Sequence, residues 1–144
     1  MDEESEKELI LQGRCVVPGI KEGTALVLTR SISAFGGIDP YNSKIVESGH
    51  PQKGEEVKRK ILIFPNGKGS SGFSLYFHMI SLLGNAPRAM IICRLNSLTA
   101  LGAVVGNIPT IAGPFGEGKN PLELIKTGDK ILVDATSGNI FKIV

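Results

Sequence analysis

The feature that most constrains the fold is a strand, a glycine–serine loop and a helix that follow one another in the middle of the chain. Residues 57–64 have a strand composition, and their second half, 61–64, is continuously apolar, which is typical of a central strand covered on both faces. Pro65 ends this strand, and the pattern beyond the loop predicts a helix over 71–83, with Gly84 at the position of a helix C-terminal glycine. These three elements predict a domain of the α/β class.

The rest of the chain is rich in short strands and turns. Gly (18) and Pro (8) together supply 26 of the 144 residues, or 18%, against an average of about 12%, and this favours a β-rich fold. Residues 31–55 form a long irregular segment with apolar residues spread through it, so we do not expect it to be wholly disordered. The other predicted elements are strands at 9–17 (with a possible bulge at Gly13), 24–29, 89–93 and 108–112, a short helix at 98–105, one helical turn at 121–125, and a hairpin of strands 129–134 and 140–144.

We therefore expect one compact domain over residues 9–144, with one main central helix, preceded by an acidic, flexible terminus at 1–8. The net charge is +2, but residues 1–8 hold five acidic residues and one lysine, a local charge of −4, so the remainder carries +6. A basic body of this kind can attract an anionic substrate or an acidic partner surface. Scattered basic residues and the absence of tryptophan argue against nucleic acid binding.

The composition also indicates where the protein is located and whether this chain can bind a metal cofactor. No apolar stretch reaches the length of a bilayer span, and the acidic N-terminus is unlike a signal peptide, so we expect a cytoplasmic protein. Cys15 and Cys93 are the only cysteines, and two thiolates cannot ligate an iron–sulfur cluster alone. No spacing of His, Cys, Asp and Glu resembles a complete metal site, so this chain by itself is expected to bind no metal.

The loop Pro65–Ser71 is the candidate for chemistry. The first turn of a helix offers unpaired N–H groups and partial positive charge, glycine lets the backbone approach a ligand, and Lys68 adds a full charge. On spacing alone, a plain helix cap is the better explanation of Ser70 or Ser71. The order Gly-x-Gly-Ser-Ser matches neither a Walker motif nor a nucleophile elbow.

The predicted helix carries apolar residues on two sides. One stripe consists of Phe73, Tyr76, Phe77, Ile80 and Leu83, and the other of Leu75, Met79 and Leu82. Either the helix is buried on both sides within this domain, or one stripe faces a partner protein. The sequence does not assign roles to His50, His78, Arg88 and Arg94. The two arginines are either candidates for phosphate binding or ordinary exposed arginines at strand ends.

Four segments together resemble the small, swivelling-domain subunit of the aconitase X family. They are Ser33–Pro40, His50-Pro51 with Gly54, Pro65–Ser74, and Gly84–Pro87. The resemblance extends over nearly the whole chain from Leu9. It implies a swivelling β/β/α domain that closes over a larger aconitase-X-type subunit, as a heterodimer, with a [4Fe-4S] cluster on that subunit.

The resemblance also implies an activity and a site. The reaction is the dehydration of (R)-mevalonate 5-phosphate to trans-anhydromevalonate 5-phosphate, a hydro-lyase step in an archaeal route to isoprenoids, with Ser70 as the catalytic base and Ser71 as the second candidate. The expected substrate-binding residues are Gly67, Lys68, Gly69 and Ser71, with Phe35, Gly36, Gly37 and Asp39 lining the same cleft or the interface with the partner. For Asp39 and its neighbours, a tight turn is an equal explanation.

One difference from the aconitases proper reduces the number of candidate substrates. Aconitases proper place an arginine after the serine pair to bind a substrate carboxylate, whereas this chain has Gly72. That argues against citrate or isocitrate. The alternatives are another aconitase-X-type hydroxy-acid dehydratase, including the hydroxyproline type, or a non-catalytic binding or regulatory module of the same fold. A phosphohistidine-carrying swivel domain is disfavoured, because neither histidine lies in a glycine-rich loop.

Overall fold

The computed structural model describes residues 6–34, 36–68 and 72–144, without the side chain of Phe73. Over these ranges it contains one eight-stranded mixed sheet and three helices. The strands are β1 (Lys7–Gln12), β2 (Arg14–Val17), β3 (Ile20–Val27), β4 (Lys60–Phe64), β5 (Ala89–Ile92), β6 (Thr110–Ala112), β7 (Lys130–Asp134) and β8 (Asn139–Ile143), and the helices are α1 (Gly72–Leu82), α2 (Ser97–Gly106) and α3 (Pro121–Leu124).

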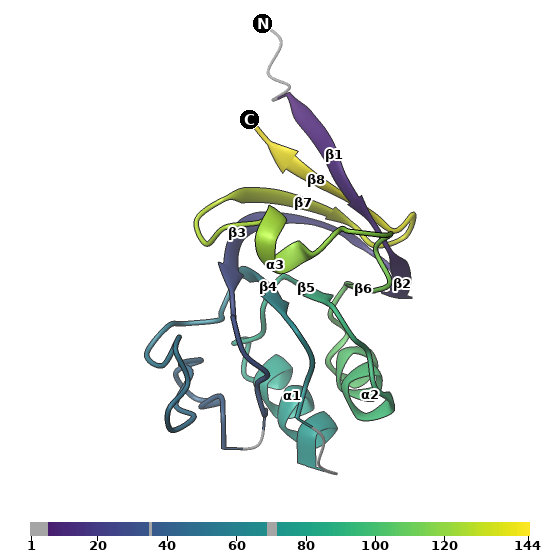
Figure 1. The fold of residues 1–144 in the computed structure, drawn as a ribbon. Coiled ribbons are helices and arrows are strands. Elements are labelled where there is room, and N and C mark those ends of the chain that lie inside the picture. The colour runs from purple at the N-terminus through teal and green to yellow at the C-terminus, as the bar shows by residue number, and fades with distance from the viewer. Residues whose placement is uncertain (1–5, 35, 69–71) are drawn as a thin grey trace, which may run out of the picture.

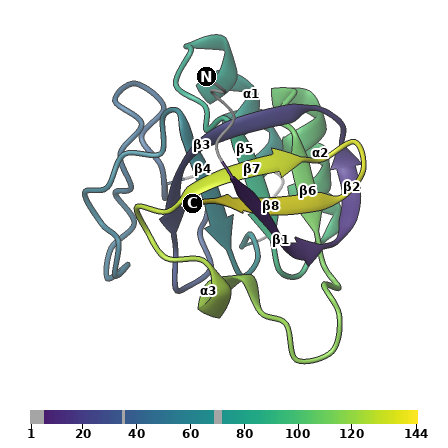
Figure 2. The ribbon, with the colours of Figure 1, turned by 90° about the horizontal axis from the view of Figure 1, so that it is seen from above.

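The sheet has the order β1-β8-β7-β3-β4-β5-β6-β2. Strands β3 to β6 are parallel to one another, and the remaining pairs are antiparallel. The sheet curls, so that β1, β8 and β7 lie above the parallel strands while α1 and α2 lie below them (Figure 1). Viewed from above, β7 and β8 cross over β4 and β5 (Figure 2). The result is the expected β/β/α arrangement.

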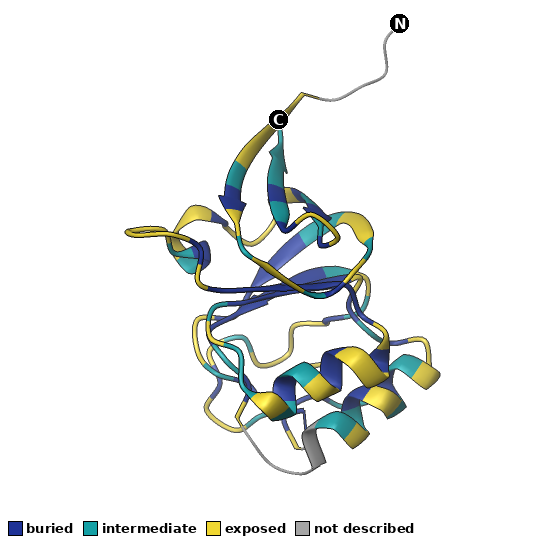
Figure 3. Cartoon of the chain, turned by 90° about the vertical axis from the view of Figure 1, so that its right-hand side faces the viewer, coloured by how far each residue is buried: buried dark blue, intermediate teal, exposed yellow. Residues whose placement is uncertain are grey.

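Two apolar clusters occupy the two faces of the parallel strands. In β4, Leu62 and Phe64 belong to the cluster shared with the helices, whereas Ile61 and Ile63 belong to the cluster shared with β7 and β8. All four side chains are fully buried, because both faces of the strand are covered (Figure 3). This confirms the prediction of a central strand made from the continuous apolar run.

The helices follow the predicted signals. Gly84 has φ +76° just after α1, a conformation that glycine adopts without steric cost. Helix α2 extends one residue beyond the predicted 98–105 at each end. Its N-cap is Asn96, whose side chain accepts a hydrogen bond from Thr99 N, and Asn107 closes it in the left-handed conformation.

The predicted single strand over 9–17 is wrong, because the chain changes partners at Gly13. Strand β1 pairs with β8, and β2 pairs with β6 at the other edge of the sheet. A Cβ atom at Gly13 would lie 2.6 Å from the Phe115 ring and 2.7 Å from the Ala112 carbonyl oxygen, so the crossing requires glycine. Strand β1 begins at Lys7, which brings the last two residues of the acidic segment into the sheet.

The segment 31–55 is irregular but packed, as expected. It contains isolated bridges in place of strands, yet Ile38 and Ile45 are fully buried. The side chain of Asn85 holds it by donating to the carbonyls of Pro40 (2.7 Å) and Tyr41 (3.0 Å). None of the helices in the described ranges has the length and apolar character required to cross a bilayer.

Candidate functional site

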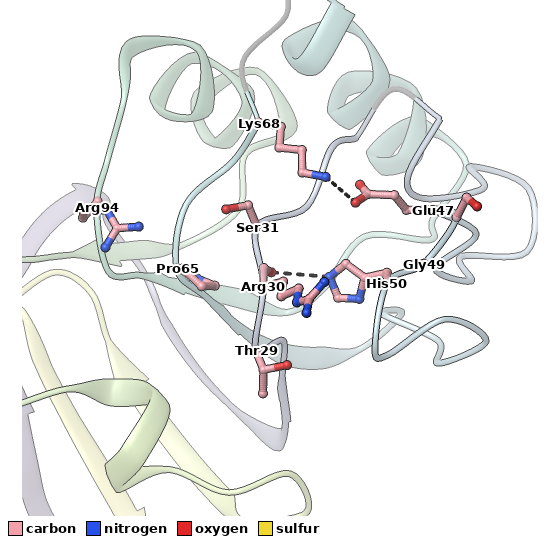
Figure 4. Close-up of a pocket in the computed structure, with 10 residues that line it drawn as sticks. Thr29, Arg30, Ser31, Glu47, Gly49, His50, Pro65, Lys68 and Arg94 are labelled. Carbon is pink, nitrogen blue, oxygen red and sulfur yellow. Dashed lines mark hydrogen bonds and ion pairs between the residues drawn. The ribbon is translucent and has the colours of Figure 1, made fainter.

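A cavity of about 430 Å³ lies at the carboxyl ends of the parallel strands β3, β4 and β5. This is the edge where α/β sheets generally bind ligands, because the loops after neighbouring parallel strands meet there. Residues 29–31 follow β3, Pro65 and Lys68 follow β4, and Arg94 follows β5 (Figure 4). The full lining is Thr29, Arg30, Ser31, Glu47, Ser48, Gly49, His50, Pro65, Lys68 and Arg94.

Lys68 is held by two interactions. Its backbone N–H donates to Ile32 O (2.9 Å), and its Nζ lies 2.5 Å from Glu47 Oε2. Glu47 also accepts a hydrogen bond from Ser33 N through Oε1 (3.1 Å). Burial alone would raise the pKa of Glu47, but the hydrogen bonds from Lys68 and Ser33 and the lysine charge outweigh it, so this pKa lies below its ordinary value of 4.5.

Asn66 organises the cavity wall from the loop after β4. Its Oδ1 accepts hydrogen bonds from Ser31 Oγ (2.9 Å) and from Arg94 Nη2 (2.9 Å). The next residue, Gly67, is buried, and its carbonyl accepts from Asn96 Nδ2 (3.0 Å). The described part of the loop after β4 is therefore fixed on one side to the segment after β3 and on the other to the N-terminus of α2.

His50 is buried and supports the β3 side of the cavity. The N–H of Gln52 donates to its Nδ1 (3.0 Å), which leaves Nε2 as the donor toward Arg30 O (3.4 Å). Both nitrogens are thus used within the fold. In this geometry His50 supports the backbone at Arg30.

The predicted site residues fall into three groups. Lys68 lines the cavity and Gly67 precedes it in the same loop, whereas Phe35, Gly69, Ser70 and Ser71 are outside the described residues. Gly36 and Asp39 line a second hollow, together with Tyr41, Tyr76 and Met79 among others. Asp39 is engaged in a turn, since its Oδ1 accepts from Tyr41 N (2.8 Å) and its carbonyl accepts from Ser43 N (2.7 Å).

Gly37 is required by close packing. A Cβ atom there would lie 1.8 Å from Ser33 O, and its own carbonyl accepts from Val46 N (2.8 Å). Gly37 therefore allows the close approach of residue 33 and the segment that carries Glu47.

Sequence reasoning did not single out Glu47, Arg30, Ser31 or Asn66. Asn66 lay within the quoted loop, but its role as a double acceptor depends on residues 35 and 28 positions away. The two arginines that were candidates for phosphate binding lie in different places. Arg94 lines the cavity, whereas Arg88 lies at the start of β5 and donates from Nε to Glu22 O (2.9 Å) beside a different hollow.

Helix α1 is buried on one side and exposed to solvent on the other. Phe77 and Ile80 of the first stripe are fully buried, whereas Leu75 (61%) and Leu82 (74%) of the second stripe are exposed. Leu75, His78 and Val105 line a shallow hollow between α1 and α2. In the single chain, the second stripe is thus available to a partner.

The cavity suits an anion. Arg30, Lys68 and Arg94 line it together with the carboxylate of Glu47, a net charge of +2 from these four side chains. The residues present do not suit a metal cluster: within the described ranges no three His, Cys, Asp or Glu side chains lie close enough to hold an ion. Cys93 is half-buried, and burial raises the pKa of its thiol.

Comparisons with known proteins find relatives over nearly the whole chain. A family model described as the aconitase X swivel domain matches residues 10–142. The chain is 38% identical over 130 residues to the phosphomevalonate dehydratase small subunit of Methanocella arvoryzae, covering 90% of this chain and 96% of the relative. It is 33% identical to the protein of that name from Thermococcus kodakarensis, covering 90% and 93%.

Two solved structures are also similar. A chain in the crystal structure of Thermococcus kodakaraensis aconitase X in its holo-form superposes with a TM-score of 0.86 at 32% identity, over 96% of this chain and 99% of that one. A relative solved by solution NMR superposes with a TM-score of 0.79 at 33% identity, with the same coverage. Both likenesses extend over essentially the whole domain.

Proposed function

Because the chain belongs to the aconitase X swivel-domain family, we propose that it is the small subunit of a phosphomevalonate dehydratase, a hydro-lyase. The observation that carries the proposal is that relatives of this name match nearly end to end, and that the cavity they would share is cationic. The reaction is the loss of water from (R)-mevalonate 5-phosphate to give trans-anhydromevalonate 5-phosphate, in the cytoplasm and in an archaeal route to isoprenoids.

The larger subunit is proposed to hold the [4Fe-4S] cluster, because this chain lacks a matching donor set. Cys15 lies in β2 and Cys93 follows β5, and neither belongs to a metal-binding group in the described residues. When bound in the partner, the cluster supplies the Lewis acid for the departing hydroxyl. This chain supplies binding groups and a base.

Ser70 is the proposed base for the proton next to the substrate carboxylate. A serine hydroxyl is a weak base unless its environment stabilises the alkoxide. Lys68 precedes it by two residues, and α1 begins two residues after it, so a cation and the positive end of a helix dipole are both nearby in sequence. Closure over the larger subunit would exclude water and strengthen both effects.

Gly67, Lys68, Gly69 and Ser71 are proposed to bind substrate oxygens beside Ser70. Because Glu47 pairs with Lys68, the ammonium group is already oriented before substrate arrives. Gly72, the first residue of α1, has no side chain with which to bind a carboxylate. The substrate carboxylate is therefore assigned to the loop N–H groups and the partner.

The test is turnover by the assembled heterodimer. Ser70→Ala should lower kcat by roughly 10²–10⁴-fold, the usual contribution of a general base, with heterodimer formation unchanged. Ser71→Ala is the comparison variant: as a proposed binding residue it should raise KM with a much smaller fall in kcat than Ser70→Ala; the reverse ranking of the two kcat values would transfer the role of base to Ser71. Near-normal kcat in both variants would leave a non-catalytic binding module as the better account. Turnover of another hydroxy acid in place of phosphomevalonate would replace the substrate and keep the reaction class.

A further inference from the structure

The proposed substrate carries a carboxylate at one end and a phosphate at the other. We infer that Arg30 and Arg94 bind this phosphate, in the cavity at the ends of β3 and β5. The inference rests on the proposed function for the identity of the substrate, but it concerns a site that can also be tested without turnover.

The charges of the cavity match a phosphate. Lys68 is compensated by Glu47, so the uncompensated charge of the lining resides on Arg30 and Arg94. Within the described part of the chain, neither arginine has a carboxylate at ion-pair distance. A phosphate monoester carries about −1.5 to −2 at pH 7, which balances a cavity of net charge +2 better than a carboxylate of charge −1.

Arg94 is oriented without being neutralised. Its Nη2 donates to the side-chain oxygen of Asn66, a neutral acceptor, and its backbone N–H donates to Pro65 O (2.8 Å). A carboxylate at position 66 would fix the guanidinium equally well but would cancel its charge. The amide therefore leaves the remaining donors of the fork, with their full charge, for an anion.

Arg30 is placed from the opposite side of the same cavity. Its carbonyl is held by buried His50, and the neighbouring Thr29 N–H donates to Gln52 Oε1 (3.1 Å). These contacts anchor the backbone while the guanidinium remains exposed. Figure 4 shows Arg30 and Arg94 on either side of Pro65, in the segments that follow β3 and β5.

The kinetic experiment uses the assembled heterodimer with Arg30→Gln and Arg94→Gln, and with Arg88→Gln as the control at the other end of β5. Each cavity variant should raise KM for phosphomevalonate, and the inhibition constant of inorganic phosphate, roughly ten- to a hundredfold, the factor expected when hydrogen bonds to a charged group are lost. Arg88→Gln should change neither constant. Unaltered phosphate inhibition in both cavity variants would overturn the inference.

A second measurement separates this site from the proposed function. Inorganic phosphate is titrated into the isolated full chain, and the Nε–Hε signals of Arg30 and Arg94 are followed by NMR, with acetate as the carboxylate control. Both signals should shift, and phosphate should bind more tightly than acetate. Acetate binding as tightly as phosphate would refute a phosphate site, whereas phosphate binding without turnover of phosphomevalonate would refute the proposed function alone.

Discussion

Lys68 and Glu47 form an ion pair between loops that are 21 residues apart in sequence, with Nζ 2.5 Å from Oε2. Glu47 comes from the irregular segment after β3, and Lys68 comes from the loop after β4. The pair therefore closes one side of the cavity by joining its two walls. The carboxylate is mostly covered (17% exposed) and the ammonium is about half exposed (54%).

Glu47→Gln should make the free energy of unfolding depend less on pH in the acidic range. The pKa of Glu47 is held below 4.5 in the folded chain, so its contribution is present above the pKa of an unfolded glutamate and is lost as pH falls through the folded value. The free energy of unfolding should differ between wild type and variant by at most about 1 kcal/mol at neutral pH, because the lysine is exposed. The difference should vanish in acid, as measured by urea unfolding across pH.

The control for this pair is Glu55→Gln, a change at an exposed carboxylate of the same segment that has no ion pair among the residues described. Its stability should follow wild type at every pH. A Glu47→Gln difference that persists unchanged at low pH would show that lost packing, and not lost charge, is responsible.

Asn96 should couple helix capping to the geometry of the site loop. Its Oδ1 accepts from Thr99 N (2.9 Å) and Thr99 Oγ1 (2.8 Å), while its Nδ2 donates to Gly67 O. Asn96→Ala removes both functions and should cost about 1 kcal/mol of stability for the cap. Asn96→Asp retains the cap acceptor but loses the donor to Gly67.

The two Asn96 variants should therefore separate stability from turnover. Asn96→Asp should unfold at a urea concentration closer to wild type than Asn96→Ala does, yet its kcat in the heterodimer should fall, because the loop that leads to Ser70 is no longer held. Wild-type kcat in Asn96→Asp would show that the contact with Gly67 does not position the loop.

Local pattern was sufficient for the main elements of the fold. The apolar run of β4 predicted a strand covered on both faces, and Gly84 marked the end of α1, because both signals depend on neighbours in sequence. The change of partners at Gly13 was not predictable in this way. It depends on contacts with Ala112 and Phe115, about a hundred residues further along the chain.

In the candidate site, too, residues identified by local sequence differ from residues that only the three-dimensional structure brings in. Lys68 was predicted because it lies in the loop itself, whereas Glu47 and Arg30 reach the cavity from a segment without regular pattern. Arg94 and Arg88 were indistinguishable as arginines that flank one strand. Only the direction of β5 places one at the carboxyl edge, with the cavity, and the other at the opposite edge.

Cys15 should be alkylated faster than Cys93. Cys15 is exposed in β2, whereas Cys93 is half-buried and the pKa of its thiol is raised by burial, which lowers the fraction of reactive thiolate. Iodoacetamide labelling followed by mass spectrometry should show modification of Cys15 first. Cys15→Ala should abolish the fast phase, and equal rates at the two sites would contradict the burial described.

The exposed stripe of α1 should bind the larger subunit. Leu75 and Leu82 follow the site loop on one helix, so a partner that closes over the loop reaches them directly. Leu75→Lys should weaken the heterodimer at least about tenfold, since a buried apolar contact would become a desolvated charge. Ile20→Lys is the matched control, because Ile20 is equally exposed (60%) but lies at the start of β3. Calorimetric titration with the larger subunit should show weaker binding for Leu75→Lys alone, with unchanged urea unfolding of both isolated variants. Equal affinity in the two variants would place the interface elsewhere.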